Sequence, residues 1–134
     1  MDLAATWQQG QLSWILLARY EEELPPKGML GIFDWHTRHA LSPFMTTCSS
    51  QYTYIPTKTQ PMLHAVVVDT GQSRSAKNAY FNNEAHARSL VNLCTKMRIA
   101  RIGMSAKDFG FLSQSQAKEV LAPYFSGIDL WIMQ

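Results

Sequence analysis

Two cysteines and four histidines supply the side chains of this sequence that could act as nucleophiles, proton carriers or metal ligands. His36 and His39 lie close together, and Cys48 follows further along the chain. Their spacing matches no zinc pattern and a fourth ligand is missing nearby, so no metal site is predicted. A small enzyme that pairs Cys48 with a histidine is one hypothesis, and it requires a lowered thiol pKa. Packing or surface roles are the simpler interpretation of these residues.

The sequence contains neither of the usual glycine-rich phosphate-binding loops. Gly-x-x-x-x-Gly-Lys-Ser/Thr and Gly-x-Gly-x-x-Gly are both missing, and the seven glycines are scattered singly. A cradle of backbone amides for a nucleotide therefore has no obvious place to form. We predict no cofactor and no nucleotide hydrolysis by the usual route.

Two aspartates each follow an apolar run of the kind that forms a strand. Asp34 closes the run 28–34 and Asp69 closes the run 63–69. Both would then lie at the carboxyl ends of strands, where open α/β sheets place their sites. An ordinary strand terminator is the simpler interpretation of each.

Cationic side chains make direct contact with RNA or DNA a second hypothesis, because lysine and arginine bind phosphates. Such binding would weaken steeply with salt. The 12 basic and 10 acidic residues are nearly balanced, however, and no aromatic residues interleave with the basic cluster in 96–107. Charge alone therefore does not indicate a nucleic-acid partner. The candidate residues are Arg38, Arg74, Lys77, Arg98, Arg101 and Lys107.

A central helix is the clearest element that would position these residues. Apolar side chains between Ala87 and Met97 recur at steps of three and four, which places them on one helical face. Asn82 or Asn83 can cap the start, with Glu84 in the first turn where the helix dipole favours an anion. The spacing therefore predicts a helix that begins near residue 84.

The remaining elements follow from apolar runs and from proline and glycine. Strands are expected at 28–34, 63–69, 108–112 and 128–133, and further helices over 2–24, after Ser42 and after Ser113. Residues 52–61 are expected to form a loop, because Pro56 and Pro61 exclude a central strand, and 99–107 a connector. Alternating strands and helices predict an α/β fold, with a mostly parallel sheet of four or five strands and helices on both faces.

Size and composition set the outer bounds. A chain of 134 residues with 46% hydrophobic and 16% charged residues is expected to form one domain, 1–134, with a packed core. The start of the chain lacks the basic and apolar segments of a signal peptide. No apolar run approaches the roughly 20 residues that a spanning helix needs. We expect an intracellular protein, nuclear or cytoplasmic, with reduced cysteines and no membrane association.

Three segments together resemble the second RecA-like domain of superfamily-one RNA/DNA helicases of the nonsense-mediated-decay type. Residues 66–72, then 78–85 and the helix after them, resemble the family's strand and its S-Y-x-N-x-x-E-A signature. Residues 108–113 resemble its D-I-G-I-I-T segment, and residues 34–44 resemble Q-Y-R-M-H-P-x-L-S-x-F. The likeness runs from about Leu12 to Phe125. It implies a RecA-like fold of the helicase second-domain type.

The nucleotide-handling residues of that family are replaced in this chain. His36 stands where the family has the arginine that reaches the γ-phosphate, and the first RecA-like domain with its phosphate-binding loop is missing. The resemblance therefore implies a helicase-derived module that is not an enzyme. It would act through a protein partner or self-association, as a scaffold, adaptor or regulator in an RNA or DNA pathway. The replaced nucleotide-site positions are Asp34, His36, Gln114 and Lys118.

Overall fold

A computed structural model describes residues 2–21, 26–45, 50–76 and 78–134 of the chain. The first half contains α1 (Leu3–Gln8), β1 (Trp14–Arg19), α2 (Gly28–His36), α3 (Ser42–Met45), β2 (Tyr52–Pro56) and β3 (His64–Asp69). The second half contains η1 (Tyr80–Asn82), α4 (Glu84–Lys96), β4 (Arg101–Ser105), η2 (Lys107–Phe109), α5 (Gln114–Leu121), η3 (Ala122–Tyr124) and β5 (Asp129–Met133), where η marks a 3-10 helix.

The strands form one sheet in the order β2-β3-β1-β4-β5. β1 pairs in parallel with β3 and β4, and β4 pairs in parallel with β5. β2 is antiparallel to β3 at the edge of the sheet. The predicted α/β class, with a mostly parallel sheet and helices on both faces, is therefore confirmed, and the sheet has five strands.

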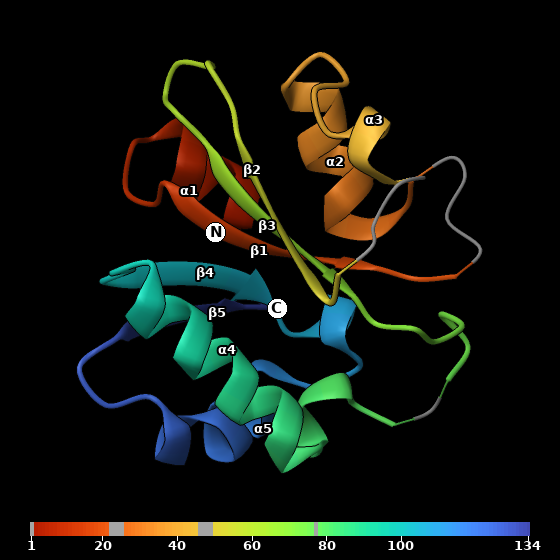
Figure 1. Ribbon diagram of the computed structural model, residues 1–134, viewed down its shortest axis with the longest axis vertical. Coiled ribbons are helices and arrows are strands. Elements are labelled where there is room, and N and C mark those ends of the chain that lie inside the picture. Colours follow the sequence, from red (N-terminus) through yellow and green to blue (C-terminus); the bar gives the residue numbers. More distant parts are fainter. Residues whose placement is uncertain (1, 22–25, 46–49, 77) are drawn as a thin grey trace.

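Helices cover the two faces of the sheet separately, so the core has two layers (Figure 1). Leu16 and Val68 point to the face that α4 and α5 cover, and Ile15 and Val67 point to the face that α1 and α2 cover. Because β1 and β3 are buried on both faces, their sequences are continuous apolar runs rather than alternating ones.

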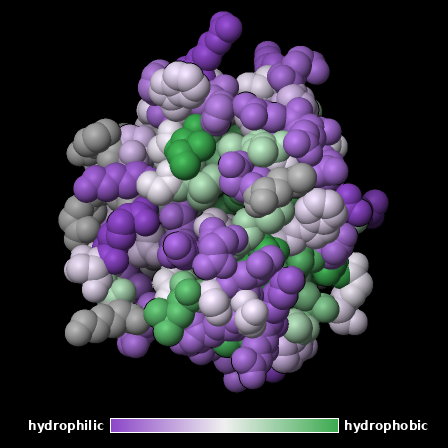
Figure 2. All heavy atoms as spheres, turned by 180° about the vertical axis from the view of Figure 1, so that it is seen from behind, coloured by the Kyte–Doolittle hydropathy of each residue, from purple (hydrophilic) through white to green (hydrophobic). Residues whose placement is uncertain are grey.

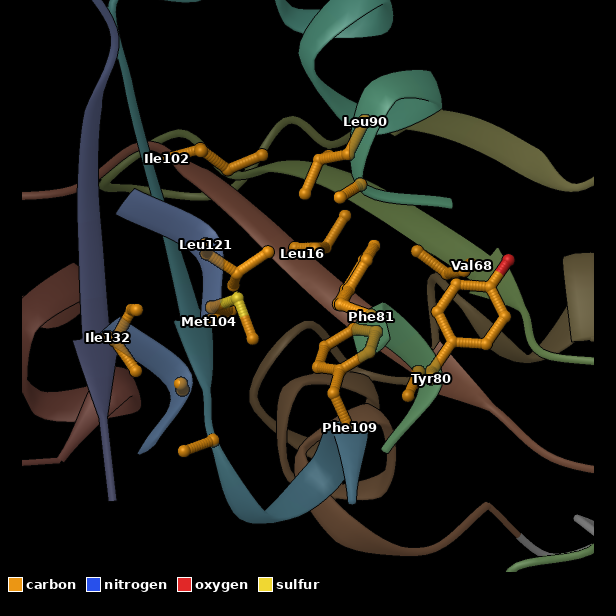
Figure 3. Packing of buried hydrophobic residues seen from close by; sticks show 14 of the residues in the cluster. Leu16, Val68, Tyr80, Phe81, Leu90, Ile102, Met104, Phe109, Leu121 and Ile132 are labelled. Carbon is orange, nitrogen blue, oxygen red and sulfur yellow. The ribbon is translucent and has the colours of Figure 1, made fainter. Parts of the chain in front are cut away.

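Aromatic side chains fill the centre of the α4–α5 layer. Phe81 of η1 and Phe109 of η2 face each other with ring centroids 5.1 Å apart, close to Leu16 of β1 (Figure 3). Both rings are fully buried. Since η2 directly follows β4, this packing fixes the turn that leaves the carboxyl end of that strand.

The two helices predicted from their caps are confirmed. Asn83 caps α4, because its Oδ1 accepts a hydrogen bond of 2.9 Å from the amide of Ala85. Ser113 caps α5, because its Oγ accepts a hydrogen bond of 3.1 Å from the amide of Gln116. β3 and β5 also lie where the apolar runs predicted them, and a short helix begins at Ser42.

The predicted helix over 2–24 is wrong. Its first part is helical, but the chain turns at Gly10, whose φ is +77°, and residues 14–19 form the central strand of the sheet. Apolar residues at every position from Ile15 to Ala18 are buried on alternate faces. A strand covered on both sides has no polar face, so its hydrophobic pattern cannot be distinguished locally from that of a buried helix.

The predicted strand over 28–34 is also wrong, since these residues form α2. Gly28 has a φ of +60°, and the buried residues Leu30, Phe33 and Asp34 follow at steps of three and one. Because Phe33 and Asp34 lie three and four positions after Leu30, all three side chains share one helical face. Asp34 therefore does not lie at the end of a strand.

Three further segments differ from their predictions. The expected loop at 52–61 contains the edge strand β2. Pro56 is the last residue of this strand, where the lack of a backbone N–H costs no hydrogen bond in the sheet. The expected connector at 99–107 contains β4, whose Gly103 lies against Leu3 and Leu12 without room for a Cβ. The expected strand at 108–112 is instead the end of η2 and a turn at Gly110, whose φ is +83°.

Candidate functional site

The topology places its switch point at the carboxyl ends of β1 and β4. The chain passes from β1 to β3 on one side, and then from β3 back across β1 to β4 on the other side. In open α/β sheets, ligands bind outside the carboxyl ends of the strands where the order reverses in this way. Tyr20 follows β1 at this point, and Asp108 follows β4.

Asp108 contacts the start of α2 at this switch point. Its Oδ2 accepts a hydrogen bond of 2.8 Å from the backbone amide of Met29. A Cβ on Gly28 would collide with Oδ1 of the same carboxylate, so the close approach requires glycine there. The first amides of a helix have no partner within the helix and carry partial positive charge, which favours an anion.

Arg74 and Tyr20 also contact Asp108. Nη1 of Arg74 lies 3.5 Å from Oδ1 of Asp108, and its guanidinium carbon lies 4.4 Å from the centre of the Tyr20 ring. The hydroxyl of Tyr20 donates a hydrogen bond to the backbone carbonyl of Asp108. We call Tyr20, Gly28, Met29, Arg74 and Asp108 the Asp108 cluster. It joins four separate segments, and it brings a cation, an amide at the start of a helix and an aromatic ring together at one point.

A second polar group lies along the same edge, beyond the end of β3. Asp69 is the last residue of β3, as predicted, and its Oδ1 lies 3.3 Å from Nη1 of Arg19. The His86 ring stacks on the Tyr80 ring at 4.0 Å, and Gln51 donates a hydrogen bond to the Tyr80 hydroxyl. Burial raises the pKa of Tyr80, and the hydrogen bond from Gln51 offsets only part of this effect.

A hollow of about 450 Å³ adjoins the start of α2. Lys27, Ile32 and Trp35 line part of it, and Trp35 is 71% exposed. On the face of the molecule seen from behind, hydrophilic residues cover most of the surface, and hydrophobic residues lie in small separate groups (Figure 2). The predicted protein partner or self-association stays a prediction.

The four replaced nucleotide-site positions do not come together. Asp34 and His36 lie on α2, on one face of the sheet, whereas Gln114 and Lys118 lie on α5, on the other face. Nδ1 of His36 lies 3.3 Å from Nε2 of Gln8, and Gln114 donates a hydrogen bond to the carbonyl of Ile132.

Asp34 has a structural role at the end of α2. Burial raises its pKa, but hydrogen bonds from Ser42, His39 and the Leu41 amide outweigh burial, so the pKa lies below its ordinary value. The Ser42 hydroxyl donates at 2.6 Å and the Leu41 amide at 3.1 Å. Asp34 therefore fixes the turn between α2 and α3.

The predicted nucleic-acid contacts are divided between the two ends of the sheet. Arg74 and Lys107 lie at the carboxyl edge, whereas Arg98 and Arg101 lie at the amino edge, before and at the start of β4. Arg38 follows α2 and is exposed, with a φ of +56°. Lys77 lies outside the described residues. These side chains do not form one basic surface.

The described residues give no support to metal or thiol chemistry. Among them, no group of three or more histidine, cysteine, aspartate or glutamate side chains could hold a metal ion. Cys94 is buried, and burial raises its thiol pKa to about 11. Cys48, the residue of the thiol hypothesis, is outside the described ranges. No helix in those ranges is long and apolar enough to cross a membrane.

Comparisons with known proteins identify the fold. No family model matches the chain, and no curated protein matches its sequence. The structure is similar to the macrodomain of Mycobacterium tuberculosis DarG, with a TM-score of 0.69 and 16% identity over 90% of this chain and 88% of that one. It is also similar to the macrodomain of Thermus aquaticus DarG, with a TM-score of 0.65 and 14% identity over 92% and 89% of the two chains. The chain therefore has a macrodomain-like fold.

This finding corrects the assignment made from the sequence. The RecA-like helicase assignment is wrong, because the similar structures are macrodomains, a different fold. The helicase-derived module is wrong for the same reason, and the comparisons give no support to RNA or DNA binding either. The conclusion that the chain is not an enzyme and is a degenerate helicase half is also overturned, because it rested on missing helicase groups. In this structure residues 34–44 lie in α2, α3 and the turn between them, and residues 108–113 lie in η2 and the turn after it, so the match of short motifs did not identify the fold.

Sequence reasoning missed the residues of the Asp108 cluster other than Arg74. The sequence patterns predict Tyr20 inside a long helix and Asp108 inside a strand. One signal was present in the sequence. An apolar run from Trp14 to Ala18, followed by Pro26 and Gly28, is the pattern of a central strand that ends before a helix begins.

Proposed function

We propose that this chain recognises ADP-ribose, or an ADP-ribosyl group attached to another molecule, at the carboxyl edge of its sheet. Macrodomain neighbours suggest ADP-ribose binding or hydrolysis. The observation that carries the proposal is the Asp108 cluster, which sets the Met29 amide and Arg74 at the carboxyl edge, where such a sheet binds ligands.

The chemistry of the cluster suits a nucleoside diphosphate. A helix start with a nearby arginine binds phosphate oxygens through charge-assisted hydrogen bonds. The hollow beside α2 adds an apolar wall that includes Ile32 and Trp35, against which a base or a sugar can pack. Phosphate groups would bind at the cluster, and the nucleoside part would lie in the hollow.

Calorimetric titration with ADP-ribose tests this assignment. Arg74→Gln is expected to weaken binding about tenfold, because a charge-assisted contact to the diphosphate is lost. Arg101→Gln is the matched control, since Arg101 also pairs with an aspartate and lies over an aromatic ring, but at the amino edge. The Arg101→Gln variant should bind ADP-ribose with the same affinity as the unchanged protein. Lack of ADP-ribose binding, or equal losses in both variants, would overturn the proposal.

Hydrolysis of an ADP-ribosyl linkage is a second candidate, favoured by Asp69. This carboxylate lies on the same edge and in register with Arg19, the residue before Tyr20. It could accept a proton from water that attacks the anomeric carbon, and it could pass this proton to the acceptor as the bond between that carbon and the acceptor breaks. Asp69→Asn should then abolish release of ADP-ribose from a modified acceptor, measured by chromatography, and leave ADP-ribose binding intact. Binding without release by the unchanged protein would restrict the chain to recognition.

A further inference from the structure

We propose that Asp108 is an internal competitor of the ligand, whose carboxylate occupies the position of a phosphate and must leave before a diphosphate can bind there. This inference rests on the proposed function and concerns the same site. It assigns to Asp108 the control of affinity for phosphate-bearing ligands.

The competition follows from shared donors. The carboxylate of Asp108 accepts a hydrogen bond of 2.8 Å from the Met29 amide and lies 3.5 Å from the Arg74 guanidinium. An entering phosphate would need this same amide and this same cation, and two anions cannot share them without strong repulsion. With the carboxylate in place, the most favourable anion position at the start of α2 is already taken.

The main chain at Asp108 is held independently of its carboxylate. Tyr20 donates to the backbone carbonyl of Asp108, and the next side chain, Phe109, is fully buried against Phe81. Rotation of the Asp108 side chain alone therefore vacates the position, with no rearrangement of the turn. Arg74 is about one-third exposed, so it can follow an incoming phosphate at the carboxyl edge.

A carboxylate in this place has a selective effect. Ligands that carry phosphate must compete with it, whereas a nucleoside without phosphate need not. Asp108→Asn keeps the size of the side chain and an oxygen that can accept the Met29 amide, but it removes the charge. Hydrogen bonds to a charged acceptor are stronger than those to a neutral one, so the amide is easier to displace.

The experiment measures the affinity of the unchanged protein and of Asp108→Asn for ADP-ribose and for adenosine. We expect Asp108→Asn to bind ADP-ribose about five- to tenfold more tightly and adenosine equally well. Glu84→Gln is the matched control, because Glu84 is an exposed carboxylate in the first turn of α4, the helix that follows β3. It removes the same charge from another helix start and should leave both affinities unchanged.

The possible outcomes separate this inference from the proposed function. ADP-ribose binding that Asp108→Asn does not improve overturns the competition and leaves the proposed function standing. An equal gain for adenosine, or an equal gain in Glu84→Gln, also overturns it. Binding by Asp108→Asn but not by the unchanged protein supports the competition and overturns the proposed function of the unchanged chain, and no binding by either overturns both.

A measurement on the unchanged protein covers the case in which the variant does not fold. Titration with ADP-ribose is followed by NMR at the Met29 amide and at the carboxyl carbon of Asp108. Competition predicts that both signals shift together, with one midpoint. A shift at Met29 while the Asp108 carboxyl stays unchanged would show that no exchange takes place.

Discussion

The two ends of the sheet each hold an arginine that pairs with an aspartate and lies over an aromatic ring. At the carboxyl edge, Arg74 lies 3.5 Å from Asp108 and 4.4 Å from the centre of the Tyr20 ring. At the amino edge, Arg101 lies 3.0 Å from Asp129 and 4.7 Å from the centre of the Trp131 ring. Residue types and distances are thus nearly the same in both groups.

Burial and connectivity distinguish them. The Asp108 side chain is 10% exposed and accepts the amide at the start of α2, so its group joins segments that are distant in the sequence. The Asp129 side chain is 53% exposed, and its partners are the neighbouring strand residue Arg101 and the nearby Trp131. Hydrogen bonds from Trp131 and then Arg101 lower the pKa of Asp129, but in the open solvent this has little effect on stability. The same residue types form a buried cluster at one end and a surface ion pair at the other.

The largest expected difference between the two ends comes from the residue that follows each aspartate. Phe109→Ala should lower the free energy of unfolding by about 3–5 kcal/mol, because it removes a fully buried ring from the α4–α5 layer. Leu130→Ala should cost clearly less, because Leu130 is only partly buried. Urea unfolding of both variants measures this, and equal losses would show that the two ends are anchored alike.

Asp34 extends the comparison, because it holds the far end of the helix that Asp108 caps. Asp34→Asn should cost about 2 kcal/mol at neutral pH, since the Asp34 carboxylate accepts several hydrogen bonds.

The pH dependence gives the sign of this effect. Because the pKa of Asp34 is lowered in the folded protein, its stabilisation is complete above the ordinary pKa of 3.8 and is lost as the pH falls through the folded value. Thermal unfolding across acidic pH should therefore show a shallower loss of stability in Asp34→Asn. The same slope in the variant and the unchanged protein would contradict this assignment. Asp129→Asn serves as the control with a smaller expected change of slope, because the Asp129 carboxylate is exposed to solvent.

The smallest effect compares the two aspartates directly. Asp108→Ala should lower stability by about 1–2 kcal/mol, because the Met29 amide loses its acceptor at the start of α2. Asp129→Ala should change stability little, since both partners at the amino edge remain in contact with water. Denaturant titration measures the free energy of unfolding of both variants, and a larger loss in Asp129→Ala than in Asp108→Ala would contradict this expectation.

Local patterns predicted the elements whose partners lie within a few residues. The cap at Asn83 and the spacing from Ala87 to Cys94 identified α4, and the apolar run before Asp69 identified β3. Ser113 identified the start of α5. For the two helices the determining contacts are hydrogen bonds or side-chain spacings within one or two turns, whereas β3 was identified by its apolar run although its partner β1 is distant in the sequence.

Prediction failed where burial came from elsewhere in the chain. Residues 14–19 became a strand because they pair with β3 and β4, and residues 101–105 did so because they lie between β1 and β5. Gly103 illustrates the reason, since it is a poor strand former by itself and is required by the approach of Leu3 and Leu12. Prediction of the candidate site failed for the same reason, because its residues belong to four segments that are distant in the sequence. These residues are Tyr20, Met29, Arg74 and Asp108.

By itself the sequence determined an α/β chain with two capped helices and a buried parallel core, because hydrophobic spacing and caps act over short distances. Only the tertiary structure decided which strand lies at the centre, that the fold is macrodomain-like, and that Asp108 rather than Asp34 lies at the carboxyl edge. These outcomes depend on the order of the strands and on contacts between distant segments, which no local spacing specifies.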